Sequence, residues 1–255
     1  RRWLTLFSAV ILVAGGWWMG HLFERTADAR ERDRLLQQAA LVAGTINIER
    51  VQALSFTAED RSNPGFQRLR GQLMAYAAAL RLRSIYSMAI RHGRVVFGPE
   101  SLDESDPIAS PPGTAYEKPP AALINVFRTR QIQSVGPYTD EYGTFVSAFA
   151  PVLDPRTGSV VLVVGVDMEA KAWQAALTRS WLVPVLTTVA LFVILLTGSV
   201  MLERRRSASM DRQGRLRHAE SWVTAAAGLV LTLGTAYWAH DSEDFSRRTR
   251  FAQLA

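Results

Sequence analysis

The chain of 255 residues is 48% hydrophobic and 20% charged, and its formal net charge is +6. It contains no cysteine, which excludes disulfides, thiolate metal sites and a cysteine nucleophile. No basic patch interleaved with aromatic residues accompanies the positive charge, so the composition does not indicate a nucleic-acid-binding protein.

Three apolar segments hold most of the hydrophobic excess. Trp3–Phe23 and Trp181–Leu202 contain no charged side chain, and a helix of roughly 20 such residues crosses the hydrocarbon core of a bilayer. The third segment, Trp222–Ala239, is slightly shorter. The first is too long for the core of a signal peptide and lacks a small-residue cleavage site, which favours an anchor. We therefore predict transmembrane helices at residues 1–23, 181–202 and 221–240.

The distribution of basic residues predicts how these spans are oriented. The loop 203–220 between the second and third spans holds six arginines against three acidic residues. Short basic loops stay in the cytoplasm. We therefore place this loop and the N-terminus inside the cell, and residues 24–180 and 241–255 outside. The expected location is the inner membrane, crossed several times, with a periplasmic or extracellular domain at 24–180.

The external segment begins with helical patterns. Apolar residues recur at helical spacing within 24–50, which predicts a long helix that rises from the membrane. A turn follows, where Thr57 and Ser62 are candidate caps for a second amphipathic helix at 66–82.

A hairpin, a loop and a short helix are predicted next. Residues 84–98 alternate in hydrophobicity around a His-Gly pair, which is a hairpin signal, and Tyr86 and Met88 share one strand face. The proline-rich stretch 99–120 is predicted to be a loop, and a loop of this length in a compact domain is often a lid. A short helix is expected at 121–131.

A second hairpin is predicted at 144–167. Residues 144–152 alternate small and bulky apolar side chains, and residues 159–167 are rich in β-branched ones. Pro155 and Gly158 lie in the turn between these two runs.

Polar residues lie directly ahead of this hairpin, in a predicted tight loop. Tyr138, Asp140 and Tyr142 lie there beside Gly136, Pro137 and Gly143. Two interpretations stay open: ordinary turn chemistry, or polar groups that face a small ligand. After the hairpin, a helix is predicted from Met168 into the second span, unbroken until Pro184.

These motifs together resemble the Cache sensor domains, the extracellular PAS-like domains of bacterial membrane receptors. The resemblance covers residues 30–173. It is carried by Leu41–Asn47, by the PPG of 111–113 ahead of Tyr116, by residues 136–152 and by the VVGVDMEA of 163–170. It implies an α+β fold in which a PAS-like antiparallel sheet follows a long N-terminal helix, flanked by transmembrane helices. The hairpin at 91–100 is shorter than in many relatives, and residues 241–255 resemble the start of a CHASE-type module.

The resemblance implies a small-molecule pocket between the sheet and a cap of helix and loop. The residues it points to as ligand-binding are Tyr86, Met88, Tyr138, Asp140, Tyr142, Ser147 and Asp167. Tyrosine hydroxyls and carboxylates suit an amine or an amino acid, and a carboxylate is a third ligand class to consider. Tyr86 is alternatively a core residue, and Asp167 is alternatively a cap for the helix at Met168.

The function implied is the input region of a two-component sensor histidine kinase, acting as a membrane-bound homodimer without a cofactor. No residue is an arguable catalyst, because the histidines are scattered and no hydrolase, nucleotide-binding or metal motif is present. An external hydrolase would have only His92 as a base. The output domain is expected beyond Ala255. The alternatives are the input region of a diguanylate cyclase or phosphodiesterase receptor, and an anchored scaffold that binds another protein.

Overall fold

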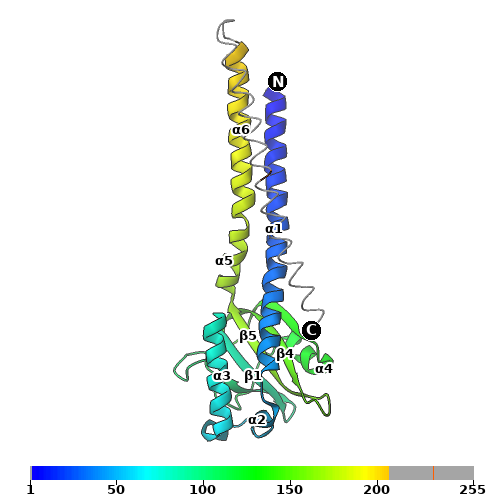
Figure 1. The fold of residues 1–255 in the computed structure, drawn as a ribbon, viewed down its shortest axis with the longest axis vertical. Helices are drawn as coiled ribbons and strands as arrows, with labels where there is room; N and C mark the ends of the chain where they lie inside the picture. The colour runs from blue at the N-terminus through cyan, green and yellow to red at the C-terminus, as the bar shows by residue number, and fades with distance from the viewer. Residues whose placement is uncertain (1, 207–231, 233–255) are drawn as a thin grey trace. The chain divides into compact units, whose positions relative to one another are not determined.

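The computed structural model describes residues 2–206 and residue 232, and its contacts divide the chain into two units (Figure 1). The helical unit comprises Arg1–Arg30 and Ala176–Ala255, and the sheet unit comprises Glu31–Ala175. The predicted third span, most of the loop 203–220 and the tail 241–255 lie outside the described residues, so their predictions stay untested.

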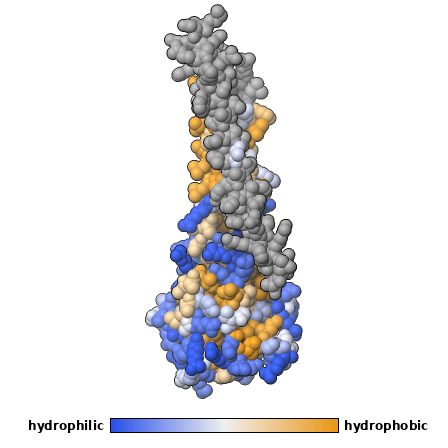
Figure 2. Space-filling model, viewed as in Figure 1, coloured by the Kyte–Doolittle hydropathy of each residue, from blue (hydrophilic) through white to orange (hydrophobic). Residues whose placement is uncertain are grey.

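The helical unit holds long apolar helices. Helix α1 (Arg2–Gly44) begins here, and so do the end of α5 (Ala170–Ser180) and all of α6 (Leu182–Arg206). By length and composition, Leu6–Gly44 and Ala170–Val200 can each cross a membrane. Figure 2 shows hydrophobic side chains exposed along these helices, which is the surface that lipid requires.

Small residues allow α1 and α6 to approach closely within the helical unit. A Cβ atom added to Gly16 would lie 2.0 Å from Oγ1 of Thr188, and one added to Gly20 would lie 2.2 Å from the Trp181 ring. Glycine at such contacts is typical of helices that pack inside a bilayer. Trp181 also donates from Nε1 to Glu24 at 3.2 Å.

The helix predicted to run unbroken from Met168 to Pro184 is interrupted. Strand β5 (Val160–Glu169) extends past Met168, and the break between α5 and α6 falls at Trp181. Proline has no N–H to donate one turn back. The carbonyl of Ser180 therefore gains no helical partner from Pro184, and α5 ends at Ser180 while Pro184 lies in the first turn of α6.

The sheet unit is built on five antiparallel strands in the order β2-β1-β5-β4-β3. The strands are β1 (Ser84–Arg91), β2 (Arg94–Glu100), β3 (Gln133–Thr139), β4 (Thr144–Leu153) and β5. Together with the helices, this sheet confirms the predicted α+β class. Both predicted hairpins are present, β1–β2 and β4–β5.

The turns of these hairpins follow from their residues. His92 and Gly93 have φ angles of 50° and 77° between β1 and β2, the left-handed pair that a two-residue hairpin needs. In the β4–β5 turn, the carboxylate of Asp154 accepts from the backbone N–H of Arg156 at 2.8 Å. One expectation was wrong: residues 136–139 belong to β3, so Tyr138 lies on a strand instead of a loop.

One face of the sheet carries the helices that precede it in sequence. Helix α3 (Pro64–Leu80) packs against β1 and β2 (Figure 1). Arg32 of α1 donates to the carbonyl of Gly136 in β3 at 2.7 Å. The helix α2 (Ile48–Gln52) and the 3-10 helix η1 (Ala58–Ser62) lie between α1 and α3 in sequence. Leu35 and Val42 of α1 are fully buried, as is Ile85 of β1. Pleating places Ile85 on the face opposite Tyr86 and Met88, as predicted.

The cap of α3 differs from both candidates named in the sequence. Asn63 accepts from the backbone N–H of Gly65 at 2.8 Å, and Pro64 occupies the first helical position. Thr57 makes no capping bond, and the Ser62 hydroxyl donates to the carbonyl of Glu59. Asparagine at the cap followed by proline is a strong helix start.

The opposite face carries α4 (Ala121–Thr129) and the loop that joins β2 to it. A core forms there between sheet and helix, in which Met88, Leu123, Val126 and Phe149 are fully buried. The same face, toward the β2 end of the sheet, holds the polar residues considered next.

Candidate ligand-binding site

A small cavity lies between strands β1, β2 and β5, the β3–β4 turn and the loop after β2. Its volume is about 20 Å³, which is room for about one water molecule. The lining residues are Ser84, Tyr86, Phe97, Glu100, Leu102, Ile108, Ser110, Tyr116, Asp140, Tyr142, Phe145 and Asp167. Three carboxylates and three tyrosines therefore converge on one point.

Asp167 lies at the base of this cavity and is 7% exposed. Its Oδ1 accepts from the Tyr86 hydroxyl at 2.9 Å and from the Ser147 hydroxyl at 2.6 Å, and its Oδ2 accepts from Ser84 at 3.2 Å. Register explains this convergence, because Ser84 of β1 and Ser147 of β4 both pair with Asp167 across the sheet. Asp167 is inside β5, so the alternative that it caps a helix is wrong.

Burial raises the pKa of Asp167 to about 6, and the hydroxyl donors of Ser147, Tyr86 and Ser84 limit the rise. Tyr138 extends the network, since its hydroxyl lies 3.0 Å from that of Ser147. The Ser147 proton goes to Asp167, so Tyr138 is the donor in that pair. Burial, and then the charge of Asp167, raise the pKa of Tyr86 and of Tyr138. Both phenols therefore stay protonated as donors.

Asp140 is the second carboxylate, and it serves the turn and the cavity together. Its Oδ1 accepts from the backbone N–H groups of Tyr142 and Gly143 at 2.9 and 3.1 Å, while its Oδ2 accepts from the Tyr116 hydroxyl. Gly143 has a φ of 146°, which a residue with a Cβ atom rarely adopts. Turn chemistry is therefore present in this loop, and the same turn places Asp140 in the lining of the cavity.

Aromatic rings form the wall opposite Asp167. The ring of Phe97 lies 5.0 to 5.8 Å from the rings of Tyr86, Tyr116 and Tyr142, measured between centroids. Burial raises the pKa of Tyr116 and of Tyr142. The wall therefore combines neutral phenol hydroxyls with buried aromatic rings.

The loop 101–116 covers the cavity and is held at its two ends. Near β2, the backbone pairs with the edge of the sheet: Phe97 donates to the Thr114 carbonyl at 2.9 Å, and Tyr116 donates to the Val95 carbonyl at 2.9 Å. Glu100 accepts from the backbone N–H of Ser110 at 2.6 Å. Burial raises the pKa of Glu100 to about 7, against the opposing effect of that bond.

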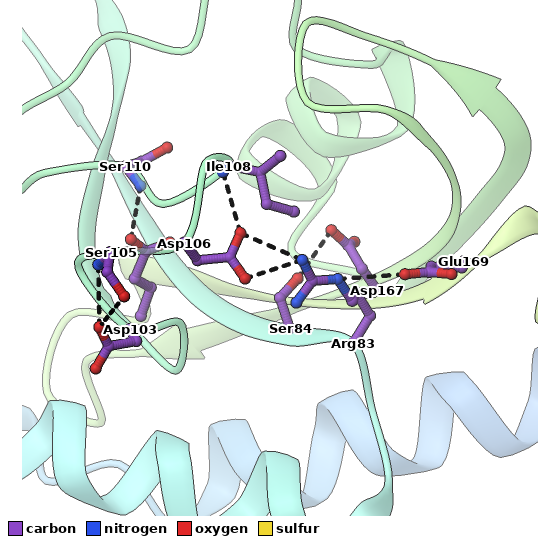
Figure 3. Close-up of polar contacts among 10 residues, drawn as sticks. Arg83, Ser84, Asp103, Ser105, Asp106, Ile108, Ser110, Asp167 and Glu169 are labelled. Carbon is purple, nitrogen blue, oxygen red and sulfur yellow. Dashed lines mark hydrogen bonds and ion pairs between the residues drawn. The ribbon is translucent and has the colours of Figure 1, made fainter.

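At the other end, Arg83 holds the loop from outside the cavity. Figure 3 shows its guanidinium between Asp106 of the loop and Glu169 at the end of β5. The nitrogen–oxygen distances are 3.0 Å to Asp106 and 3.3 Å to Glu169. The backbone N–H of Ile108, followed by Arg83, lowers the pKa of Asp106. One side chain therefore ties the covering loop to the strand that precedes α5.

The structure brings most of the predicted site residues together. Tyr86, Asp140, Tyr142 and Asp167 line the cavity, and Tyr138 and Ser147 reach Asp167 through the hydroxyl network described above. Met88 does not line it; this side chain is fully buried in the core beside α4.

Sequence reasoning missed four polar residues of the site. Ser84 could be found only from strand register, and Glu100, the last residue of β2, falls within the predicted loop 99–120. Tyr116 follows the PPG motif at 111–113, and its place in the site depends on how the loop folds. Ser110 gave no signal of its own.

Metal binding and catalysis gain no support within residues 2–206. No group of three or more histidine or acidic side chains there is placed to hold a metal ion. His92 lies in the β1–β2 turn and does not line the cavity.

Comparisons with known proteins give structural similarity only. No protein-family model matches this chain, and no curated protein sequence does. The chain is similar to the ligand-binding domain of the Campylobacter jejuni chemoreceptor Tlp3 in complex with L-valine, at 13% identity and a TM-score of 0.47, covering 68% of this chain and 67% of that one.

Two further structures are similar over a comparable share. One is the ligand-binding domain of the Pseudomonas fluorescens chemoreceptor CtaA in complex with L-alanine, at 15% identity and a TM-score of 0.38, covering 62% of this chain and 60% of that one. The other is the extracellular domain of mmHK1S-Z2, named as a histidine kinase, at 13% identity and a TM-score of 0.36, covering 64% and 62%. At TM-scores below 0.5 these similarities do not assign a ligand to this chain.

Proposed function

We propose that residues 24–180 form the ligand-sensing input region of a membrane receptor. One observation carries the proposal. A buried carboxylate of the cavity, Asp167, lies on β5, and β5 passes within three residues into α5 and the apolar helix that follows. Binding at Asp167 therefore acts directly on the segment that leads toward the membrane. The converging polar groups favour a ligand sensor over a scaffold, which needs an apolar patch and no pocket.

Ligand entry requires the covering loop to move. The cavity holds about one water molecule, so even a small organic ligand must displace Tyr116 or residues 101–112. Arg83 links Asp106 of that loop to Glu169. Opening the loop thus changes a contact at the last residue before α5. A ligand shifts such a two-state equilibrium by its differential affinity for the two states, typically about 1–3 kcal/mol.

We include the membrane topology of the chain in this proposal. Residues 1–23, 181–202 and 221–240 would cross the inner membrane, with the Cache-type domain in the periplasm or outside the cell and the basic loop 203–220 inside. The apolar composition of the first two spans supports this arrangement. The output would be a histidine kinase, or alternatively a diguanylate cyclase or phosphodiesterase, working as a homodimer, with a CHASE-type module after residue 241.

The test uses the whole chain in lipid nanodiscs. Its melting temperature is measured against panels of amines, amino acids and carboxylates. A ligand at about 100 times its Kd stabilises the folded state by about 2.7 kcal/mol, which raises the melting temperature by a few degrees. Asp167→Asn is expected to remove that shift, and Arg61→Gln, in η1 and outside the cavity lining, is expected to keep it. If no compound raises the melting temperature, the proposed function is wrong.

A further inference from the structure

We infer that the cavity selects an organic ammonium ion that carries no carboxylate, so that a simple amine binds more tightly than the corresponding amino acid. The inference rests on the proposed function and names the ligand class of the same site. Four features of the structure support it: the charge of the lining, the free acceptor positions, the aromatic wall and the state of the nearby arginines.

The lining is acidic without a compensating cation. Asp140, Asp167 and Glu100 line the cavity, and no lysine, arginine or histidine does so among the described residues. An ammonium group in this space gains attraction from each ionised carboxylate, whereas a ligand carboxylate is repelled by them. The balance of charge therefore favours a ligand with a net positive charge over a zwitterion.

Two of these carboxylates have room for one more donor. A carboxylate accepts about four hydrogen bonds, two at each oxygen. Asp167 uses both positions of Oδ1 and one of Oδ2. Asp140 likewise uses both positions of Oδ1 and one of Oδ2. Among the described residues, one acceptor position therefore remains on each Oδ2, and an ammonium group has three N–H donors to offer.

The aromatic wall provides a second attraction for a cation. Phe97, Tyr116 and Tyr142 lie with ring centroids 5.0 to 5.9 Å apart, and Tyr86 adjoins Phe97. Ring faces attract an ammonium group within about 6 Å of the centroid. The same rings suit the apolar part of an amine, while a carboxylate gains nothing from them.

The two arginines nearest the site are already engaged. Nη2 of Arg83 donates to both oxygens of Asp106, and its Nε lies 3.3 Å from Glu169. Arg70 donates to the carbonyl of Leu102 at 3.0 Å. Figure 3 shows the Arg83 guanidinium directed toward Asp106 and Glu169. A ligand carboxylate would have to displace Asp106 to reach Arg83, and it would break the attachment of the loop.

The experiment compares amino acids with their decarboxylated counterparts. The pairs are valine with isobutylamine, phenylalanine with phenethylamine, and alanine with ethylamine. Binding to the whole chain in nanodiscs is measured by isothermal titration calorimetry at pH 7.5, where every amine is protonated. We expect at least one amine to bind about tenfold or more tightly than its partner, which corresponds to about 1.4 kcal/mol.

Two variants connect this preference to the residues. Asp167→Asn and Asp140→Asn each remove a negative charge and keep the side-chain shape, so each is expected to weaken amine binding about tenfold or more. Melting without ligand shows whether each variant is folded, and the second variant keeps the test valid if the first is not. Arg83→Gln is expected to leave amine binding unchanged or stronger, because it loosens the loop.

Other results separate the inference from the proposed function. If an amino acid binds more tightly than its amine, and Arg83→Gln weakens it, Arg83 holds the ligand carboxylate and the inference is overturned while the sensor function stands. If amines bind equally well to both aspartate variants, the inference is also overturned. If neither member of any pair binds, and no compound of the wider panel does, the proposed function itself fails.

Discussion

Two buried aspartates of the sheet unit have opposite kinds of surroundings. Asp60 is 4% exposed and accepts from the backbone N–H groups of Ser55 and Phe56, at 3.0 and 2.7 Å, and from the Ser55 hydroxyl at 2.9 Å. Asp167 is 7% exposed and accepts only from side-chain hydroxyls.

The difference indicates which carboxylate is structural and which is available for binding. Asp60 holds a turn in which Phe56 has a φ of 57° and is 2% exposed, and backbone donors cannot turn to another partner. Hydroxyl groups rotate, so the donors of Asp167 can rearrange around a ligand. We therefore expect Asp60 to contribute to stability and Asp167 to contribute to function. Four predictions test this contrast.

The largest effect is expected from Asp60→Ala. This change leaves the buried N–H of Phe56 and the part-buried N–H of Ser55 without an acceptor, and an unsatisfied buried donor costs about 1–3 kcal/mol. We expect the free energy of unfolding to fall by about 3 kcal/mol in chemical denaturation of the whole chain. Glu59→Ala, an exposed neighbour, is the control and should change stability by less than about 0.5 kcal/mol. Equal effects of the two variants would show that Asp60 is not structural.

Asp167→Asn is expected to have the opposite outcome. The buried carboxylate has a raised pKa, so its charge destabilises the unliganded fold at pH 8 and the neutral amide removes that cost. We expect the free energy of unfolding at pH 8 to stay equal or to rise by up to about 2 kcal/mol, while the ligand-induced shift in melting temperature is lost. A loss of stability as large as that of Asp60→Ala would make Asp167 a structural residue.

The raised pKa values predict how stability depends on pH. Asp167 moves from 3.8 to about 6 and Glu100 from 4.5 to about 7, each mainly by burial. The folded state thus takes up protons more readily than the unfolded chain. The resulting stabilisation is complete below about pH 4 and is lost as pH rises through about 6 for Asp167 and about 7 for Glu100.

We therefore expect the unliganded melting temperature to fall between pH 5 and 8, and amine binding to strengthen over the same range as both carboxylates ionise. The other ionisable groups facing Asp167 are Tyr86, Tyr138 and Asp140, and the two phenols stay neutral here. The pH series is repeated on the Asp167→Asn, Glu100→Gln double variant. If the double variant keeps the wild-type slope, other groups cause the dependence.

The smallest effect on stability is expected from Arg83→Gln. The Arg83 side chain is 32% exposed, and ion pairs of this kind contribute about 0–1 kcal/mol. The loop should nevertheless open more often, so limited proteolysis within residues 101–112 should become faster. Arg61→Gln is the matched control, because Arg61 meets Glu104 of the same loop at 4.0 Å with both side chains more than half exposed. Equal proteolysis of both variants would show that Arg83 does not hold the loop.

Much of the fold could be read from local patterns. The β-branched run at 159–167 and the turn at Gly158 predicted the β4–β5 hairpin, and His92-Gly93 predicted the β1–β2 turn. Stiff side chains and glycine in the left-handed region act over a few residues, so they are visible without a structure. Boundaries were less accurate, as at Met168, which continues β5 because it pairs with Val146 of β4.

The part of the candidate site whose residues lie close together in sequence could also be predicted. Tyr138, Asp140 and Tyr142 are close together in sequence, so their grouping was evident before their contacts were known. Ser84 lies 83 residues from Asp167 and meets it only through the pairing of β1 with β5. Tyr116 reaches Asp140 across 24 residues through the folding of the loop.

Asp167 has one feature that the residue order predicts and one that only the tertiary structure determines. Its place at the end of a strand, next to the helix leading toward the apolar segment, followed from the order of residues alone. That it accepts three hydroxyl donors in a cavity, instead of capping a helix, depends on the register of three strands. Register is determined by pairing between distant segments, which local preferences do not specify.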